Sequence, residues 1–319
     1  MRKDLLPANA VLASNRLADH VRATPLDYSP WLSEETGARV YLKLENLQYT
    51  GSFKLRGAFN KLLGMSEAQR RSGCVAASSG NHGAAVAFAM STLGVEGVIF
   101  VPEQTSSIKV AAIREAGAEV RFFGTDGLDT ETHAREYAAE RGMVYLSPYN
   151  DPDVIAGQGS CGAEIARQLG EIDALFVAIG GGGLIAGVGG FLKSVNPRMT
   201  IVGCQPEASA VMAHSIEAGR IIDMPTRPTL SDGTAGGIES GAITFDLCRE
   251  IVDDYVLVPE EAIAGAMRTF IDRHHMLAEG AAAVALAGVL SEGRRFRNCN
   301  VVAIVCGGNV SRETLKKVL

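Results

Sequence analysis

Apolar positions along the chain alternate between short continuous runs and longer segments with helical spacing. The short runs are typical of buried strands, and the longer segments are typical of helices that pack one face against a core. Strands are predicted at residues 74–78, 98–101, 119–123, 143–146, 174–179, 200–205 and 301–305. Helices are predicted between them at residues 82–93, 107–116, 126–141, 154–169 and 184–195. This alternation predicts an α/β fold with parallel, doubly wound sheets.

One more helix is predicted just after residue 52, because apolar residues recur there with helical spacing. They form one face: Leu55, Ala58, Phe59, Leu62 and Leu63. Lys54 therefore lies in the first turn, and Ser52 is the expected N-cap. The helix dipole disfavours a cation at this end, and partial burial would also lower the pKa of the amine.

A neutral lysine amine at such a position is a nucleophile toward carbonyl groups. The alternative is a solvated lysine at a helix end, which describes most lysines. Arg56 and Lys61, on the same predicted helix, are interpreted as surface charges of this ordinary kind.

Three loops at the ends of predicted strands have unusual sequences, and ligands of doubly wound sheets bind at such ends. The first loop, residues 78–83, reads SSGNHG and opens a helix. Its N–H groups, the helix dipole and its hydroxyls suit an anion such as a carboxylate. The alternative is an ordinary turn in which Ser or Asn caps the helix.

The second loop is a run of four glycines: Gly180, Gly181, Gly182 and Gly183. Such a run lets the backbone close around a phosphate and point its N–H groups at it. The spacing of Gly181, Gly183 and Ala186, with Glu207 after the next strand, also resembles a dinucleotide fingerprint. A tight turn without a ligand is the third interpretation.

The third loop, residues 306–309, reads CGGN and follows the last predicted strand. It places the thiol of Cys306 at a strand end, although a lone cysteine is more often a buried structural residue. Together with Lys54, the three loops match the parts of pyridoxal 5′-phosphate and an amino-acid substrate: aldehyde, phosphate, carboxylate and ring nitrogen. Binding of NAD would leave Lys54 and the SSGNHG loop unexplained.

Composition narrows the class of protein without changing this picture. The chain has 319 residues, 47% of them apolar and 21% charged, and a net charge of −6 at pH 7 that is spread along the sequence. No apolar run is long enough for a membrane span or a signal peptide, and the six cysteines form no C-x-x-C pair. We therefore expect a cytosolic protein with reduced thiols and no nucleic-acid or membrane partner.

Several stretches resemble the fold-type II family of pyridoxal-phosphate enzymes, in its threonine dehydratase and serine racemase branch. They include LKLENLQYTGSFKLRGAFNKL, SSGNHGAAVA, SPYNDPDVIAGQGSCGAEI, GGGGLIAG, AEGAAAVAL and CGGNVS, which run in the family's order over nearly the whole chain. The resemblance implies two parallel-sheet domains with the cofactor between them. Residues 1–47 and 148–319 would form a large cofactor-binding domain, and residues 48–147 a small domain that carries Lys54 and the Asn81 loop. A homodimer is also implied.

The resemblance assigns roles to individual residues. Lys54 would bond the cofactor aldehyde and later move the Cα proton, and Phe53 would pack beside it. Asn81 would bind the ring hydroxyl. The substrate carboxylate would be bound by the loop that contains Ser78, Ser79, Gly80, Asn81 and His82. The phosphate would be bound by Gly180, Gly181, Gly182, Gly183 and Leu184. The ring would be lined by Gly233 and Glu279, with Cys306 facing its nitrogen, where many relatives have serine.

The activity that follows is β-elimination of water from a β-hydroxy amino acid of the threonine or serine type, which yields a 2-oxo acid and ammonia. A neutral thiol at the ring nitrogen would favour elimination over transamination. Ser79 keeps an amino-acid racemase as the alternative within the same fold, since racemases of this branch use a serine there. An NAD-dependent oxidoreductase and a non-catalytic binding protein are the alternatives of other classes.

Two departures from the family pattern bear on the substrate and on metal binding. Residues 231–244, together with Tyr149 and Asn150, resemble hydroxyectoine-utilisation dehydratases, so the substrate would be larger than threonine. Relatives that bind a divalent cation have acidic residues where this chain has Gln205 and near Val211, so we expect no divalent metal. The chain also stops soon after residue 309, so we expect no C-terminal regulatory domain and no feedback control by isoleucine.

Overall fold

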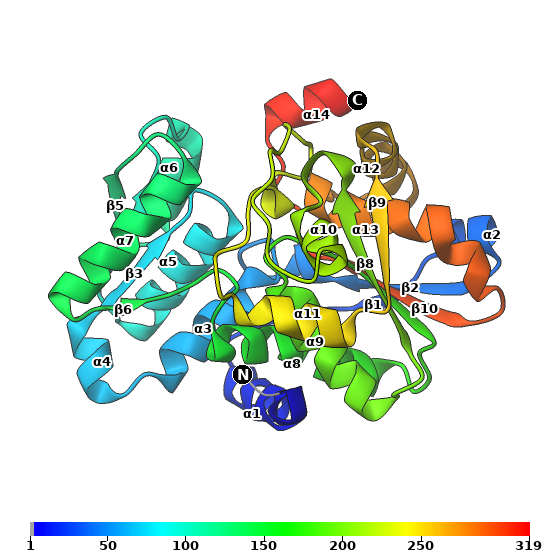
Figure 1. Ribbon diagram of the computed structural model, residues 1–319, viewed down its shortest axis with the longest axis horizontal. Coiled ribbons are helices and arrows are strands. Elements are labelled where there is room, and N and C mark those ends of the chain that lie inside the picture. Colours follow the sequence, from blue (N-terminus) through cyan, green and yellow to red (C-terminus); the bar gives the residue numbers. More distant parts are fainter. Residues whose placement is uncertain (1–2) are drawn as a thin grey trace.

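Two parallel sheets form the framework of the computed structural model, which describes residues 3–319 (Figure 1). The larger sheet has the strand order β1 (Leu26–Tyr28), β2 (Arg39–Leu44), β10 (Asn300–Val305), β7 (Ala174–Ala178), β8 (Thr200–Pro206) and β9 (Asp254–Val258). The smaller sheet has the order β5 (Glu119–Phe122), β4 (Gly97–Val101), β3 (Cys74–Ala77) and β6 (Val144–Tyr145). All neighbours pair in parallel except β1 and β2. The predicted α/β fold with parallel sheets is confirmed.

Helices connect the strands and cover the sheets. In chain order they are α1 (Leu6–Leu17), α2 (Pro30–Thr36), α3 (Lys54–Gly64), α4 (Glu67–Ser72), α5 (Asn81–Leu93), α6 (Ser107–Glu115), α7 (Gly127–Arg141), α8 (Pro152–Gln168), α9 (Gly183–Val195), α10 (Val211–Glu217), α11 (Ile243–Ile251), α12 (Glu260–His274), α13 (Gly280–Glu292) and α14 (Arg312–Val318). None of the helices within residues 3–319 is long and apolar enough to cross a membrane.

All seven predicted strands are present, whereas β1, β2 and β9 were not predicted. The three missed strands lie toward the edges of the larger sheet. Strands β1 and β9 are mostly exposed or half-buried. Strand β2 reads RVYLKL and carries a buried lysine. None of the three therefore shows the continuous apolar run that marks a strand buried on both faces.

Strand β8 shows how the larger sheet is buried on both faces. On one face, Ile201 contacts Gly189 of α9, and on the other, Cys204 contacts Gly288 of α13. Both strand residues are fully buried. Because helices cover both faces, ligands have access to this sheet mainly at the strand ends, where the loops lie.

The smaller sheet is covered in the same way. Val98 and Phe100 pack with α7 on one face, while Cys74 and Ile99 pack with α3 and α5 on the other. The latter core also takes in Leu17, Val21 and Val154, which come from segments assigned to the large domain by sequence. The division of the chain at residues 47 and 147 stays a prediction.

Helix α3 lies between the two sheets, as Figure 1 shows. Its predicted apolar face is confirmed, since Leu55, Phe59 and Leu62 are fully buried in the core of the smaller sheet. Its other side packs on α8, where Gly57 lies against Gly157. The first turn of α3, which carries Lys54, is thus held between the two halves of the molecule.

Candidate active site

The SSGNHG loop, the CGGN loop and the turn before α3 are joined by hydrogen bonds. Phe53 N donates to the carbonyl of Cys306 over 3.0 Å, and Gly308 N donates to the carbonyl of Gly51 over 2.9 Å. The side chain of Asn309 donates to the Oδ1 atom of Asn81 over 2.8 Å. The end of β10 therefore brings the turn before Lys54 and the start of α5 together, as the parallel-sheet rule predicts.

Lys54 is the first residue of α3, and its amine donates to the carbonyl of Pro148 over 2.8 Å. The amine lies 5.2 Å from the centre of the Phe53 ring. Burial lowers the pKa of Lys54 to about 8, and the nearby carboxyl groups of Glu279 and Glu131 oppose this shift without cancelling it. A substantial fraction of this amine is therefore neutral near physiological pH.

The predicted N-cap at Ser52 is wrong. Phe53 occupies the N-cap position, and no side chain caps the helix. Ser52 instead forms a backbone bridge with Gly307, and its buried hydroxyl has no hydrogen-bond partner. Pairing of the Ser52 backbone with the end of β10 takes precedence over the local capping preference.

The SSGNHG loop leads from β3 into α5. Ser78 Oγ accepts from Gly80 N over 3.1 Å, and Ser79 is half-buried beside it. No side chain caps α5, so its first N–H groups are free of intrahelical acceptors and available to an anion.

Asn81 and His82 point to different partners. Asn81 Nδ2 donates to both carboxylate oxygens of Glu279, over 2.8 and 2.9 Å. His82 is buried, and its Nε2–H donates to the carbonyl of Leu146 over 2.9 Å. Burial, with the nearby Lys54 charge, lowers the pKa of His82 to about 3, so the imidazole is neutral. Its Nε2 atom is thus bonded next to the smaller sheet, while its backbone N–H lies at the start of α5.

The four glycines form the turn between β7 and α9, and the space around them excludes side chains. A Cβ atom at Gly181 would lie 2.4 Å from the Tyr149 ring, and one at Gly182 would lie 2.8 Å from Cys248 Sγ. Gly182 also has a φ of 87°, which favours glycine. Helix α9 has no side-chain cap, so the first N–H groups, including those of Gly183 and Leu184, lack intrahelical acceptors. This turn suits an anion approached by backbone alone.

Cys306 and Glu279 lie behind the Lys54 turn, and both are buried. Burial raises the pKa of the Cys306 thiol well above its ordinary value, so it is neutral at pH 7. Burial also raises the pKa of Glu279 to about 7, although hydrogen bonds from Asn81 and Asn309 act in the opposite direction. A Cβ atom at Gly233 would lie 3.7 Å from Glu279 Oε1, which places Gly233 along the same wall.

The segment 231–244 is attached to the loop after β6 and to α7. Tyr149 Oη accepts from Glu239 N over 2.9 Å, and Asn150 Oδ1 accepts from Ile243 N over 2.9 Å. Arg135, on α7, forms an ion pair with Glu239 at 2.6 Å. These bonds hold the segment that departs most from the family pattern against the smaller sheet's side of the molecule.

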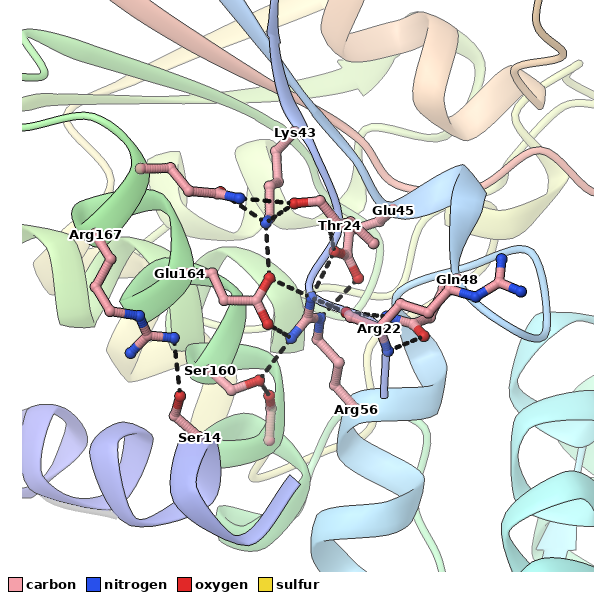
Figure 2. A network of polar contacts seen from close by, with 12 residues as sticks. Ser14, Arg22, Thr24, Lys43, Glu45, Gln48, Arg56, Ser160, Glu164 and Arg167 are labelled. Carbon is pink, nitrogen blue, oxygen red and sulfur yellow. Dashed lines mark hydrogen bonds and ion pairs between the residues drawn. The ribbon is translucent and has the colours of Figure 1, made fainter. Parts of the chain in front are cut away.

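The interpretation of Arg56 as a surface charge is wrong. Its side chain is fully buried and forms ion pairs with Glu45 and Glu164 (Figure 2). Lys61 forms a partly buried pair with Asp151 at 2.7 Å. Helical spacing offered one signal, because Arg56 lies seven residues before Leu63 and so points to the edge of the predicted apolar face. Its acidic partners come from distant elements, which sequence spacing does not reveal.

Comparison with known proteins decides the family. The model of the pyridoxal-phosphate dependent enzymes matches residues 17–307. The chain belongs to this family. Its cofactor is accordingly pyridoxal 5′-phosphate, and the dinucleotide interpretation of the glycine run is wrong.

Gln205 is the position at which cation-binding relatives are expected to have an acidic residue. Its side chain is buried, donates to the Ile179 carbonyl and accepts from Ala213 N.

Relatives with similar sequences and structures include both dehydratases and a racemase. The catabolic L-threonine dehydratase TdcB of Escherichia coli K12 is 40% identical over 308 residues, covering 96% of this chain and 93% of the relative. The structure of threonine deaminase isoform 2 from Solanum lycopersicum matches with a TM-score of 0.93 and 36% identity, covering 100% of this chain and 93% of that one. Maize serine racemase matches with a TM-score of 0.92 and 32% identity, covering 98% and 95%.

Proposed function

We propose that the protein is a pyridoxal-phosphate-dependent ammonia-lyase that removes water from a β-hydroxy amino acid and releases a 2-oxo acid and ammonia. The observation that carries this proposal is the Lys54 amine, whose pKa is lowered to about 8 beside the neutral Cys306 thiol. The similarity to TdcB and to the tomato threonine deaminase supports the threonine or serine type of substrate.

The residues present fit the cofactor. Lys54 would bond its aldehyde, and Phe53 would flank it. The uncapped turn before α9 would hold its phosphate through the backbone of Gly180, Gly181, Gly182, Gly183 and Leu184. Asn81, Gly233 and Glu279 would line the ring, and Cys306 would face the ring nitrogen. The crowding around Gly181 and Gly182 supports the phosphate position, because only backbone N–H groups have room to approach a ligand there.

When bound, the cofactor stabilises the negative charge that develops at Cα. Lys54 would accept the Cα proton, and a base with a pKa near the working pH performs this step best. Ser78, Ser79, Gly80 and the N–H groups at the start of α5, those of Asn81 and His82 among them, would bind and orient the substrate carboxylate. The bond between Asn81 and Glu279 would hold that loop in place.

Cys306 would select elimination over transamination. Its neutral thiol carries no charge to keep a ring nitrogen protonated, so charge at Cα spreads less into the ring and the β-hydroxyl leaves instead. In the variant Cys306→Asp we expect a larger share of transamination, measured as conversion of the cofactor to its amine form per ammonia released. An unchanged share would contradict this role.

A hydroxyectoine-derived hydroxy amino acid is the alternative to a substrate of the threonine or serine type. Support comes from the segment 231–244 and its bonds with Tyr149 and Asn150, which form the part that differs from ordinary threonine dehydratases. This segment meets the loop that follows β6, next to the Pro148 carbonyl bonded by Lys54. A substrate side chain would therefore contact it.

Ammonia release by the cofactor-loaded protein tests the function. The substrates would be L-threonine, L-serine, D-serine, threo-3-hydroxyaspartate and hydroxyectoine-derived diamino acids. Release from any β-hydroxy amino acid supports the lyase, and release from only the hydroxyectoine derivatives supports the specialised substrate. Absence of ammonia from every substrate would overturn the proposal.

A racemase is the second candidate, and Ser79 is the observation that favours it. Ser79 is half-buried in the loop proposed to bind the carboxylate, where a hydroxyl can donate a proton to Cα. The similarity to maize serine racemase supports the same interpretation. Appearance of D-serine from L-serine without ammonia, measured on a chiral column, would select it, and the variant Ser79→Ala would then abolish it.

We propose a cytoplasmic homodimer as the working form. The family resemblance supports the dimer, and the scattered, unpaired cysteines support a reducing compartment. Light scattering after gel filtration would give the mass, and twice the chain's 33.6 kDa is the expected result.

A further inference from the structure

Arg56 is the centre of a buried ionic network directly behind the Lys54 turn (Figure 2). Its Nε and Nη2 atoms donate to Glu45 over 2.7 and 2.8 Å. Its Nη1 and Nη2 atoms donate to Glu164 over 2.8 and 2.9 Å, and Nη1 also donates to Ser160 Oγ. Two bidentate pairs and the hydroxyl use the whole donor fork of the guanidinium. The position of this side chain is therefore fixed in every direction.

Lys43 completes the network and balances its charge. Its amine donates to Glu164 over 2.7 Å, to the Thr24 carbonyl over 2.7 Å and to Gln168 over 3.0 Å. Thr24 Oγ1 in turn donates to Glu45 over 2.5 Å. Burial disfavours the charge on Glu45, but the Arg56 charge and its hydrogen bonds lower the Glu45 pKa. The network thus contains two basic and two acidic side chains, whose formal charges balance.

The network holds the first turn of α3 from the side opposite to Lys54. Residues two apart on an α-helix project about 200° apart, so the Arg56 and Lys54 side chains leave the helix in nearly opposite directions. Lys54 points to the Pro148 carbonyl, while Arg56 points to β2, the 3₁₀ turn at Glu45 and helix α8. A rotation of the turn that moved one side chain would have to move the other.

Close backbone packing against α8 also restricts movement of the same turn. A Cβ atom at Gly157 of α8 would lie 2.6 Å from the Arg56 carbonyl and 2.7 Å from Gly57 Cα. A Cβ atom at Gly57 would lie 2.8 Å from Val154 Cγ1. Helices α3 and α8 therefore touch through their backbones at the level of Arg56, and the network fixes the turn along the remaining directions.

We propose that Arg56 is a positioning residue for Lys54, which sets the depth and rotation of the first turn of α3 and so places the amine at the reacting carbon. This inference rests on the role of Lys54 under the proposed function. A packed apolar group would stabilise this site at least as well as ions, so a geometric role explains the buried network better than stability does. Displacement of a catalytic group by about 1 Å is enough to reduce a rate by about 100-fold.

The test compares the cofactor-loaded wild type with the charge-balanced variant Arg56→Met/Glu164→Gln, which leaves one basic side chain, Lys43, and one acidic side chain, Glu45. We expect kcat for ammonia release to fall at least about tenfold, with KM within about twofold. We also expect faster loss of cofactor on dilution and a shifted pH midpoint of the visible absorbance band. Lys61→Met, which removes a partly buried ion pair on the same helix, is the matched control and should change none of these.

A purely structural role predicts a different result. Activity would then fall only with the folded fraction, while kcat per loaded molecule, cofactor retention and the absorbance midpoint would stay at wild-type values. That result would overturn the proposal.

If the double variant does not fold, Arg56→Lys provides the test, because it keeps the buried charge and loses the bidentate fork. Wild-type kcat and absorbance in Arg56→Lys would likewise contradict it. If the wild type itself releases no ammonia, the proposed function fails, while cofactor retention and absorbance still report on Arg56.

Discussion

Two cations leave the first turn of α3 in nearly opposite directions, and their pKa values shift in opposite directions although burial disfavours the charge of both. Lys54 is bonded to one backbone carbonyl, and burial lowers its pKa to about 8. Burial also disfavours the charge on Arg56, but Glu45 and Glu164 raise its pKa well above the ordinary value. The difference is the presence of contacting carboxylates. A buried cation without one becomes a base, and a buried cation with two becomes a fixed structural charge.

Replacement of Lys54 should have the largest effect on activity. In Lys54→Ala we expect ammonia release to fall by at least about 1,000-fold, because the proton-transferring base is lost. The visible absorbance of the bound cofactor should disappear with it. The fold should persist, since the amine contributes a single hydrogen bond to a carbonyl. Absorbance spectra, ammonia assays and circular dichroism measure the three expectations. A variant that keeps both the absorbance band and the activity would end the assignment of Lys54.

Replacement of Arg56 alone should have the largest effect on stability. Arg56→Met leaves Glu45 and Glu164 buried with only Lys43 to neutralise them, and breaking a buried pair costs about 3–5 kcal/mol. Denaturant unfolding measures the loss. The double variant Arg56→Met/Glu164→Gln should recover much of it, because the remaining Lys43 and Glu45 are balanced. If the single and double variants were equally unstable, uncompensated charge would not be the cause.

The sequence predicted the features around Lys54, because they follow from local pattern, but it did not predict the role of Arg56. The helix face of α3, the position of Lys54 in its first turn and the loops at the ends of β3, β7 and β10 all depend on residues adjacent in the chain. The role of Arg56 depends on Glu45 and Glu164, which come from a 3₁₀ turn and from α8. Ser52 shows the same limit, since its pairing with Gly307 at the other end of the chain takes precedence over its capping preference. Contacts between distant segments are set by tertiary packing, which a single sequence does not reveal.

Glu279 extends the comparison to a buried carboxylate. Its pKa is raised to about 7 by burial, above the ordinary value near 4.5. Between these two values the folded protein binds more protons than the unfolded chain, so stability should fall as pH rises through this range. The slope should reach at most about 1.4 kcal/mol per pH unit. Denaturant unfolding at a series of pH values measures it, and Glu279→Gln should remove this contribution. If the stability of Glu279→Gln depends on pH as that of the wild type does, the slope comes from other groups.

Replacement of Lys61 should have the smallest effect, and it tests how far access of solvent reduces the contribution of an ion pair on α3 to stability. Lys61 lies on the same helix as Arg56 and also pairs with carboxylates near the start of α8, Asp151 at 2.7 Å and Asp153 at 3.0 Å. Water reaches this cluster, since the side chain of Asp153 is 51% exposed. The side chains of Lys61 and Asp151 are themselves 19% and 13% exposed, so solvent screens this pair more than the fully buried pairs of Arg56. We therefore expect Lys61→Met to lower the free energy of unfolding by about 1 kcal/mol, well below the loss in Arg56→Met. Unfolding at low and high salt measures it. A loss as large as that of Arg56→Met would mean that the helix–helix contact, rather than burial of charge, sets the cost at both positions.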